Sequence, residues 1–273
     1  MKELTKRIIV ALIGIPLAIA LIYSGGIAFF TAILILAALS LYEYHGMMKN
    51  KGMHNFLFFN ILFAVIYFYI FLIYINGNLS SVIFINAPPI IYILFLMIIY
   101  MFTEKKKGFI ESLASSILGL IYIFAGFMSV IYIREIFSDS SGMLFLAILI
   151  SIWICDSAAY FIGKSIGRHK LAPSISPKKT WEGSIGGFVF AIVGFYLSYL
   201  LLDLEISAIT AVYSGAVVGI TGQIGDLFES KLKRDAEIKD SSNIIPGHGG
   251  ILDRFDSLLF VAPVLAVLYS VII

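Results

Sequence analysis

Long runs of apolar residues, separated by short polar stretches, dominate the chain. A helix needs about 20 apolar residues to cross the hydrocarbon core of a bilayer, at 1.5 Å of rise per residue. The runs are continuously apolar and do not alternate with a period of two, which favours spanning helices over the strands of a membrane barrel. The pattern predicts nine spans, at residues 7–23, 27–48, 56–75, 82–102, 110–134, 142–162, 183–202, 206–225 and 253–273.

Two of these spans are less regular than the others. The first has the basic start and apolar centre of a secretory signal, but it leads directly through residues 23–26 into the next run. It also lacks an Ala-x-Ala-like cleavage site, so we interpret it as a retained span. The fourth is the weakest, because Asn86, Pro88 and Pro89 interrupt its start. Glycines four residues apart, at 183 and 187 and at 215 and 219, predict close helix packing.

Composition supports a membrane protein. Of the 273 residues, 60% are hydrophobic and only 13% are charged, which is about half the charge of a soluble domain. These values exclude a soluble globular enzyme and a disordered chain. The net charge of +2 is too small to indicate a nucleic-acid partner, and the single Cys155 excludes an internal disulfide.

The basic residues give the orientation. Lysine and arginine accumulate in the cytoplasmic connections of membrane proteins. With the N-terminus inside, every lysine and arginine except Arg134 falls in an inner segment. The sequence therefore predicts an all-α integral membrane protein with about nine transmembrane helices and a cytoplasmic N-terminus. Polar residues are concentrated in two long inner loops, 163–182 and 226–252.

Four aspartates lie where a purely structural membrane protein would not place them. Asp156 is inside the sixth span, Asp226 follows the eighth, and Asp253 and Asp256 open the ninth. Ionisable residues at membrane depth mark functional sites by default. Asp253 and Asp256 share a helix face, and with Asp226 they offer three oxygen donors suited to Mg²⁺.

Two other interpretations of the aspartates explain less of the pattern. Capping of the last helix would explain Asp253 and Asp256, because acidic residues favour a helix N-terminus. It leaves Asp226 and Asp156 unexplained. A proton- or cation-translocating site would spread acidic groups through the membrane depth, whereas three of these four gather at one face.

The second inner loop combines basic residues with glycines. Residues 229–240 have a modest apolar face that fits a short surface helix, and the glycine-rich segment 245–250 follows. Glycines let the backbone approach a ligand and present N–H groups to an anion, although a connecting turn alone would also explain them. With the nearby carboxylates, the loop meets the needs of a magnesium-bound triphosphate. We expect phosphate contacts from four basic residues, Lys233, Arg234, Lys239 and Arg254, and substrate binding at His248 and Gly249.

The first inner loop has a similar chemistry. Ser176 and Thr180 are hydroxyl donors, Lys178 and Lys179 are point charges, and the N-terminus of the next helix adds partial positive charge. Topology alone explains the lysines but not the concentration of Ser, Thr, Pro and Trp. We therefore expect the loop to bind a substrate phosphate or a lipid headgroup, with Asp156 on the substrate side. It is not a Walker A loop.

Three segments carry a family pattern. They are Asp-Ser-Ala-Ala-Tyr-Phe-x-Gly-Lys at 156–164, Ser-Pro-Lys-Lys-Thr-Trp-Glu-Gly at 176–183, and residues 230–256, which end in Ile-Pro-Gly-His-Gly-Gly-Ile-Leu-Asp-Arg-Phe-Asp. Together they resemble the signature of the phosphatidate cytidylyltransferases, or CDP-diacylglycerol synthases. The resemblance is specific over 155–256. On this basis we divide the chain into N-terminal helices, 1–140, and a C-terminal catalytic region, 141–273.

The resemblance implies an activity. Enzymes of this family transfer a cytidylyl group from CTP to phosphatidic acid, giving CDP-diacylglycerol and pyrophosphate for phospholipid biosynthesis. It implies a multi-pass protein of the inner cell membrane with a cytoplasmic site, a homodimer, and Mg²⁺ at Asp226, Asp253 and Asp256. It leaves open a monovalent cation, such as K⁺, beside Mg²⁺.

Two alternative functions are also compatible with the sequence. One is another enzyme that acts on a lipid phosphate, such as a CTP-dependent polyprenol or dolichol kinase. The other, of a different class, is a cation transporter that uses the intramembrane carboxylates. The sequence lacks the interrupted-helix repeat typical of many transporters.

Overall fold

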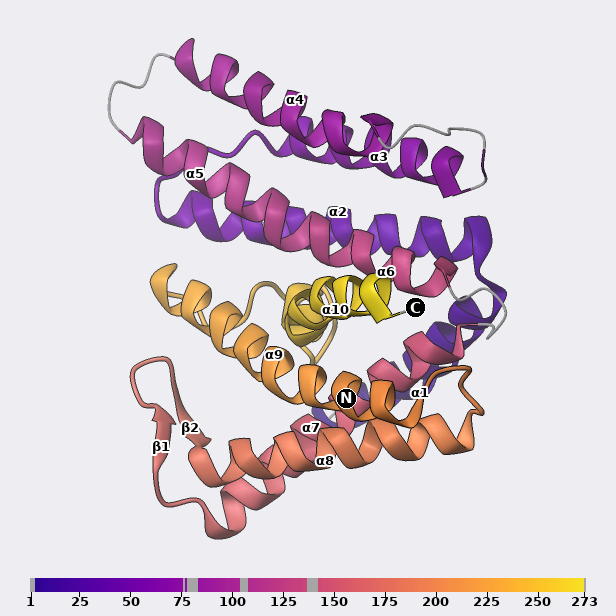
Figure 1. Ribbon diagram of the computed structural model, residues 1–273. Helices are drawn as coiled ribbons and strands as arrows, with labels where there is room; N and C mark the ends of the chain where they lie inside the picture. The colour runs from indigo at the N-terminus through magenta and orange to yellow at the C-terminus, as the bar shows by residue number, and fades with distance from the viewer. Residues whose placement is uncertain (1–2, 76, 78–82, 104–107, 137–141, 273) are drawn as a thin grey trace.

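Helices form almost the whole molecule. The computed structural model describes residues 3–75, 77, 83–103, 108–136 and 142–272 (Figure 1). The first helices are α1 (Glu3–Ser24), α2 (Gly26–Asn50), α3 (Leu57–Ile75), α4 (Ile83–Met101), α5 (Phe109–Gly119), the π-helix η1 (Leu120–Phe124) and α6 (Ala125–Ile136). The rest are α7 (Met143–Ile166), the strands β1 (Lys170–Ala172) and β2 (Ser176–Thr180), α8 (Trp181–Leu201), α9 (Ala208–Asp235) and α10 (Leu252–Ile272).

Each predicted span coincides with a helix. The window 110–134 corresponds to the continuous run α5–η1–α6. In the described part of the chain, seven helices are long and apolar enough to cross a membrane, and α1 and α4 contain the shorter apolar stretches Val10–Ser24 and Asn86–Met101. The fold is therefore that of an all-α membrane protein, while nine crossings and their orientation stay predictions.

Two local features differ from the sequence prediction. Residues 229–235, predicted to start a separate surface helix, are the last turns of α9, because no Gly or Pro follows Gly225 there and Glu229 pairs with Lys233 one turn later. The loop 163–182 contains a short antiparallel hairpin, in which Lys170 pairs with Thr180 and Ala172 with Ser176. The fold is thus all-α apart from this hairpin.

Small residues bring α7, α8 and α9 close together, as the sequence predicts. A methyl group on Gly183 would lie 2.6 Å from the carbonyl oxygen of Ala159 on α7. One on Gly215 would lie 2.6 Å from Cα of Ile192 on α8, so the backbones of α8 and α9 almost touch. Without a hydrophobic force between helices in lipid, such close contacts supply the packing energy.

Helix α10 joins the two halves of the chain. It packs against α9 and α6 and also contacts α2 and α7, and Figure 1 shows it between the N-terminal helices and the α7–α8 pair. The buried core contains Tyr44 and Phe127 from the first half together with Phe195 and Leu265 from the second. One hydrophobic core therefore runs through residues 1–140 and 141–273.

Replacing Gly215 by alanine should destabilise the protein, because the new methyl group would overlap the backbone of Ile192. Overpacking of this kind costs about 1–3 kcal/mol. Gly46 lies inside α2 with nothing within 4 Å of an added methyl group, so Gly46→Ala should be neutral or stabilise by up to about 1 kcal/mol. Thermal unfolding of both variants in detergent measures the difference. Equal midpoints would contradict the close approach of α8 and α9.

Candidate functional site

One cavity lies among the polar ends of α7, α8, α9 and α10 and the β hairpin. Its volume is about 730 Å³, which is within the range of small-molecule sites. Of the residues selected from the sequence, its lining includes Asp156, Lys178, Lys179, Thr180, Asp226, Lys233, Asp253, Arg254 and Asp256. In the described part of the chain, the lining does not include Ser176, Arg234, Lys239, His248 or Gly249.

The hairpin is fixed to the start of α8. The Thr180 hydroxyl caps α8 by accepting a hydrogen bond from the Gly183 N–H at 3.2 Å. The backbone N–H of His169 donates to the Glu182 carboxylate at 3.2 Å, and the Trp181 N–H donates to the His169 carbonyl. A methyl group on Gly167 would lie 2.6 Å from Thr180 Oγ1. The base of the hairpin therefore has a defined position against α7 and α8.

From this base, the hairpin reaches across the cavity to α9. Lys179 Nζ forms an ion pair with Asp226 Oδ2 at 2.6 Å. Lys178 and Lys170, on the same hairpin, and Lys164, near the end of α7, also line the cavity. The site residues predicted from the sequence did not include Lys164 and Lys170, although both belong to the basic loop. One wall of the cavity thus carries several ammonium groups.

Arg234 has a different position from the one expected. Its guanidinium donates to the carbonyl oxygen of Ile238 at 3.0 Å and to that of Ile175 at 3.4 Å. It therefore ties the end of α9 to the hairpin turn from outside the cavity. Its predicted contact with a phosphate stays a prediction.

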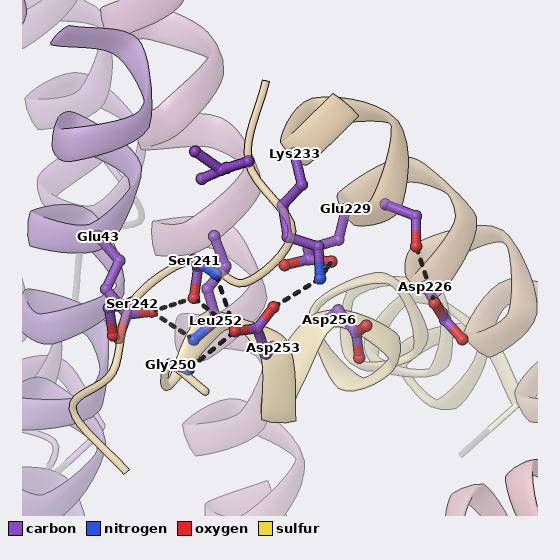
Figure 2. A network of polar contacts seen from close by, with 12 residues as sticks. Glu43, Asp226, Glu229, Lys233, Ser241, Ser242, Gly250, Leu252, Asp253 and Asp256 are labelled. Atoms are coloured by element: carbon purple, nitrogen blue, oxygen red, sulfur yellow. Dashed lines mark hydrogen bonds and ion pairs between the residues drawn. The ribbon is translucent and has the colours of Figure 1, made fainter. Parts of the chain in front are cut away.

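A buried lysine connects α9 to α10. Lys233 Nζ lies 2.6 Å from Glu229 Oε2, one turn earlier on α9, and 2.6 Å from Asp253 Oδ1 on α10 (Figure 2). The Glu229 side chain is 0% exposed and that of Asp253 is 5% exposed. A charge buried this deeply is stable only when it is paired, so the three groups form one unit. Sequence reasoning missed Glu229, which is acidic and lies three residues after Asp226.

The second oxygen of Asp253 holds the loop that precedes α10. Asp253 Oδ2 accepts hydrogen bonds from the backbone N–H groups of Gly250 at 2.8 Å and Ser241 at 2.9 Å. The Ser241 hydroxyl lies 3.0 Å from the same oxygen. Both oxygens of Asp253 are therefore engaged within the chain.

Glu43, on α2, holds the same loop from the opposite side. Only 2% of its surface is exposed, and its carboxylate accepts hydrogen bonds from the Ser241 and Ser242 hydroxyls and from the N–H groups of Ile251 and Leu252. Figure 2 shows this carboxylate facing the loop from the N-terminal half. Sequence reasoning missed Glu43, although an ionisable residue inside an apolar run was the available signal.

The glycines of the loop make room for these carboxylates. Gly249 has a φ of +84°, and a methyl group there would lie 2.7 Å from Asp253 Oδ2. A methyl group on Gly250 would lie 2.5 Å from Glu43 Oε2. The sequence suggested that these glycines present N–H groups to a bound anion. In the structure, the Gly250, Ile251 and Leu252 N–H groups serve carboxylates of the chain itself.

A buried tyrosine of the N-terminal half packs against α9 and α10. Tyr122, in the π-helix η1, packs edge-on against Phe228 of α9 and Phe260 of α10. Its side chain interacts electrostatically with Asp256 and Glu229. The π-helix η1 thus brings the first 140 residues into contact with α9 and α10 beside Asp256 and Glu229.

The carboxylates of the cavity could supply part of the coordination shell of a Mg²⁺ ion, but not a complete one. Among the described residues, no group of three or more His, Cys, Asp or Glu side chains is arranged to hold a metal ion. Asp156, Asp226 and Asp256 nevertheless face one cavity and interact electrostatically with one another, and a cation would relieve their repulsion. Mg²⁺ is commonly bound by one or two carboxylates with water and substrate phosphates, so the donor set suits this ion without a complete protein cage.

The chain is similar in sequence to known cytidylyltransferases. A sequence model of the cytidylyltransferase family matches residues 5–272. The phosphatidate cytidylyltransferase of Thermotoga maritima is 33% identical over 282 residues, covering 100% of this chain and 98% of that protein. The enzyme of that name from Staphylococcus epidermidis is 33% identical over 96% of this chain and 97% of its own length. That from Bacillus subtilis is 47% identical over 164 residues, 60% of this chain and 58% of the relative.

Replacing Lys233 by methionine should strongly destabilise the protein. The change keeps most of the side-chain volume but leaves Glu229 and Asp253 as buried carboxylates without their shared ammonium group, at a cost of about 3–5 kcal/mol. The exposed ion pair between Lys51 and Asp235 is the control, because Lys51→Met should cost at most about 1 kcal/mol. Thermal unfolding in detergent compares the two. Similar losses for both variants would contradict the buried unit.

Proposed function

We propose that this chain, which belongs to the cytidylyltransferase family, transfers the cytidylyl group of CTP to phosphatidic acid. The products are CDP-diacylglycerol, for phospholipid biosynthesis, and pyrophosphate. One observation carries the proposal beyond the family: carboxylates and lysines face each other across a single cavity in a membrane-type helical body. A reaction between two anionic phosphates requires cations for its developing charge, and the lysines on the hairpin supply them.

The proposed step is an in-line displacement at phosphorus. An oxygen of the lipid phosphate bonds to the α-phosphorus of CTP, while the bond breaks between that phosphorus and the oxygen that joins it to the β-phosphorus. The electron pair leaves with pyrophosphate, and no covalent intermediate with the protein is required. Lys178 and Lys170 contact substrate phosphates, and Arg254 contacts them beside the carboxylates of α10. Lys179 keeps Asp226 in place until substrate arrives.

We assign Asp226 and Asp256 to Mg²⁺, with Asp156 beside them. Mg²⁺ bound there would act as a Lewis acid and neutralise charge on the α-phosphate of CTP, which is part of the transferred cytidylyl group. The sequence also places Asp253 at the metal, but its oxygens hold Lys233 and the loop. A direct metal role would require Asp253 to release Lys233. A K⁺ ion beside Mg²⁺ rests on the family resemblance alone.

Charged and aromatic residues support a proposal for the membrane setting. We propose nine spans in the inner cell membrane, with the N-terminus and the cavity facing the cytoplasm. The bias of lysine and arginine towards one side supports this orientation. Tyr160 lines the cavity and Trp181 opens α8, and both are exposed in the manner of aromatic residues at a membrane interface. CTP could then enter from water and phosphatidic acid from the bilayer. A homodimer is proposed from the resemblance.

The position of the label in CTP tests the reaction. Purified protein given phosphatidic acid, Mg²⁺ and CTP labelled in cytidine should transfer the label to the lipid fraction. CTP labelled in the γ-phosphate should leave the lipid unlabelled, because pyrophosphate carries that group away. The opposite pattern would identify a CTP-dependent lipid kinase. A Mg²⁺ chelator serves as the control for metal dependence.

Substituting asparagine at Asp226 or Asp256 tests the metal assignment. Either change removes an anionic oxygen donor, and we expect cytidylyl transfer to fall by about 100-fold or more. Mg²⁺ should also raise the thermal midpoint of the unchanged protein more than that of either variant. Asp203→Asn is the control, because Asp203 lies away from the cavity with a φ of +50°, which asparagine tolerates. Full Mg²⁺ stabilisation of both site variants would contradict the assignment.

A further inference from the structure

Glu43 is unusual for its place in the chain. It belongs to α2, which is otherwise rich in apolar residues and lies outside the residues 155–256 that carry the family pattern. It is nevertheless among the most buried charged groups of the described chain. Burying a carboxylate is costly unless hydrogen bonds replace its water, so the contacts of Glu43 indicate what it does.

Its two oxygens accept hydrogen bonds in a matched pattern. Oε1 accepts from the Ser242 hydroxyl at 2.6 Å and from the Ile251 N–H at 2.8 Å. Oε2 accepts from the Ser241 hydroxyl at 2.9 Å and from the Leu252 N–H at 2.8 Å. The donors come from both ends of the segment 241–252. One side chain of α2 therefore closes this loop.

The loop leads directly into the residues of α10 that line the cavity. Leu252 is the first residue of α10, and Asp253 and Asp256, which line the cavity, follow within the next turn. Asp253 binds Ser241 and Gly250 from the other side of the loop. Gly250 fits between the two carboxylates because it has no side chain. The start of α10 therefore cannot shift relative to α2 without breaking these bonds.

We propose that Glu43 is a positioning residue for the transfer reaction. It contacts no substrate and acts by fixing the loop 241–252 and the first turn of α10, which sets where Asp253 and Asp256 face. The proposal rests on the function proposed above. It makes the N-terminal half a part of the catalytic machinery, although that half lacks the family motifs.

The bonding pattern explains why a carboxylate is needed. Each oxygen of Glu43 faces one hydroxyl, which can rotate, and one backbone N–H, which cannot. In Glu43→Gln, the amide nitrogen must face either the Ile251 N–H or the Leu252 N–H, whichever way the amide turns. Two donors then meet without an acceptor. The substitution keeps the shape of the side chain and removes only the fit to the loop.

The test uses Glu43→Gln in the full-length protein, with Ser40→Ala as the matched control. Ser40 lies on α2 one turn earlier, and its hydroxyl has no hydrogen-bond partner in the described structure. We expect Glu43→Gln to lower kcat about ten-fold or more while KM for CTP and for phosphatidic acid changes less than about three-fold, because misplaced groups slow the chemical step. Trypsin should cleave after the exposed Lys239 faster in this variant, and Ser40→Ala should match the unchanged protein in both measurements.

The outcomes are distinct. A kcat close to that of the unchanged protein would overturn the proposal, as would a loss of activity with an unchanged cleavage rate at Lys239. If Glu43→Gln does not fold, Ser242→Ala removes one donor and keeps the carboxylate, and it should show a smaller loss of kcat in the same direction. Unaltered kcat in Ser242→Ala would then overturn the proposal. If the unchanged protein transfers no cytidine to lipid, the proposed function itself is overturned. If the unchanged protein is active and Glu43→Gln is equally active, only the role of Glu43 is overturned.

Discussion

The buried Asp253 carboxylate is the interaction on which the polar end of the molecule depends. One oxygen binds the Lys233 ammonium group of α9 and the other binds the loop before α10. A carboxylate in an apolar body must have partners for each oxygen, because an unpaired one costs several kcal/mol. Asp253 therefore fixes α9, α10 and the loop relative to one another. The Ser241 hydroxyl lies between Asp253 and Glu43, so the same hydrogen-bond network also fixes the loop to α2.

Away from this end, a different force organises the helices. The contacts of α7, α8 and α9 are made by glycines whose missing side chains let the backbones approach. Two hydrogen bonds between helices add to this packing, from Ser151 Oγ on α7 to the Ala191 carbonyl oxygen at 2.9 Å and from Gln223 Nε2 on α9 to the Ser184 carbonyl oxygen at 3.0 Å. At the candidate site, the hydrogen bonds to Asp253 and Glu43 fix the loop before α10 in addition. The cavity can thus hold like charges, such as Asp226 and Asp256, at fixed positions despite their repulsion.

Much of the fold could be predicted because its signals are local. A run of 20 apolar residues specifies a helix wherever it lies, and all nine runs are helical. Asp226, Asp256 and Lys179 could be selected because they interrupt or flank such runs, and the structure brings them to one cavity. Glu43 could not be placed, because its partners lie about 200 residues away and no local pattern links them. The missing side chains of the glycines at 249 and 250 correctly predict that another group approaches the backbone closely, but the groups that do so are carboxylates of the chain itself.

The position of Glu43 also constrains the N-terminal helices. A helix turns by about 100° per residue, so a shift of one position in α2 would rotate a carboxylate away from the loop. The rest of α2 needs only apolar residues, such as the exposed Ile35, on its lipid side. Helix α2 can therefore vary in composition but not in its register against α10. The role proposed for Glu43 would therefore link a half of the chain without motif residues to a candidate site built mainly from the other half.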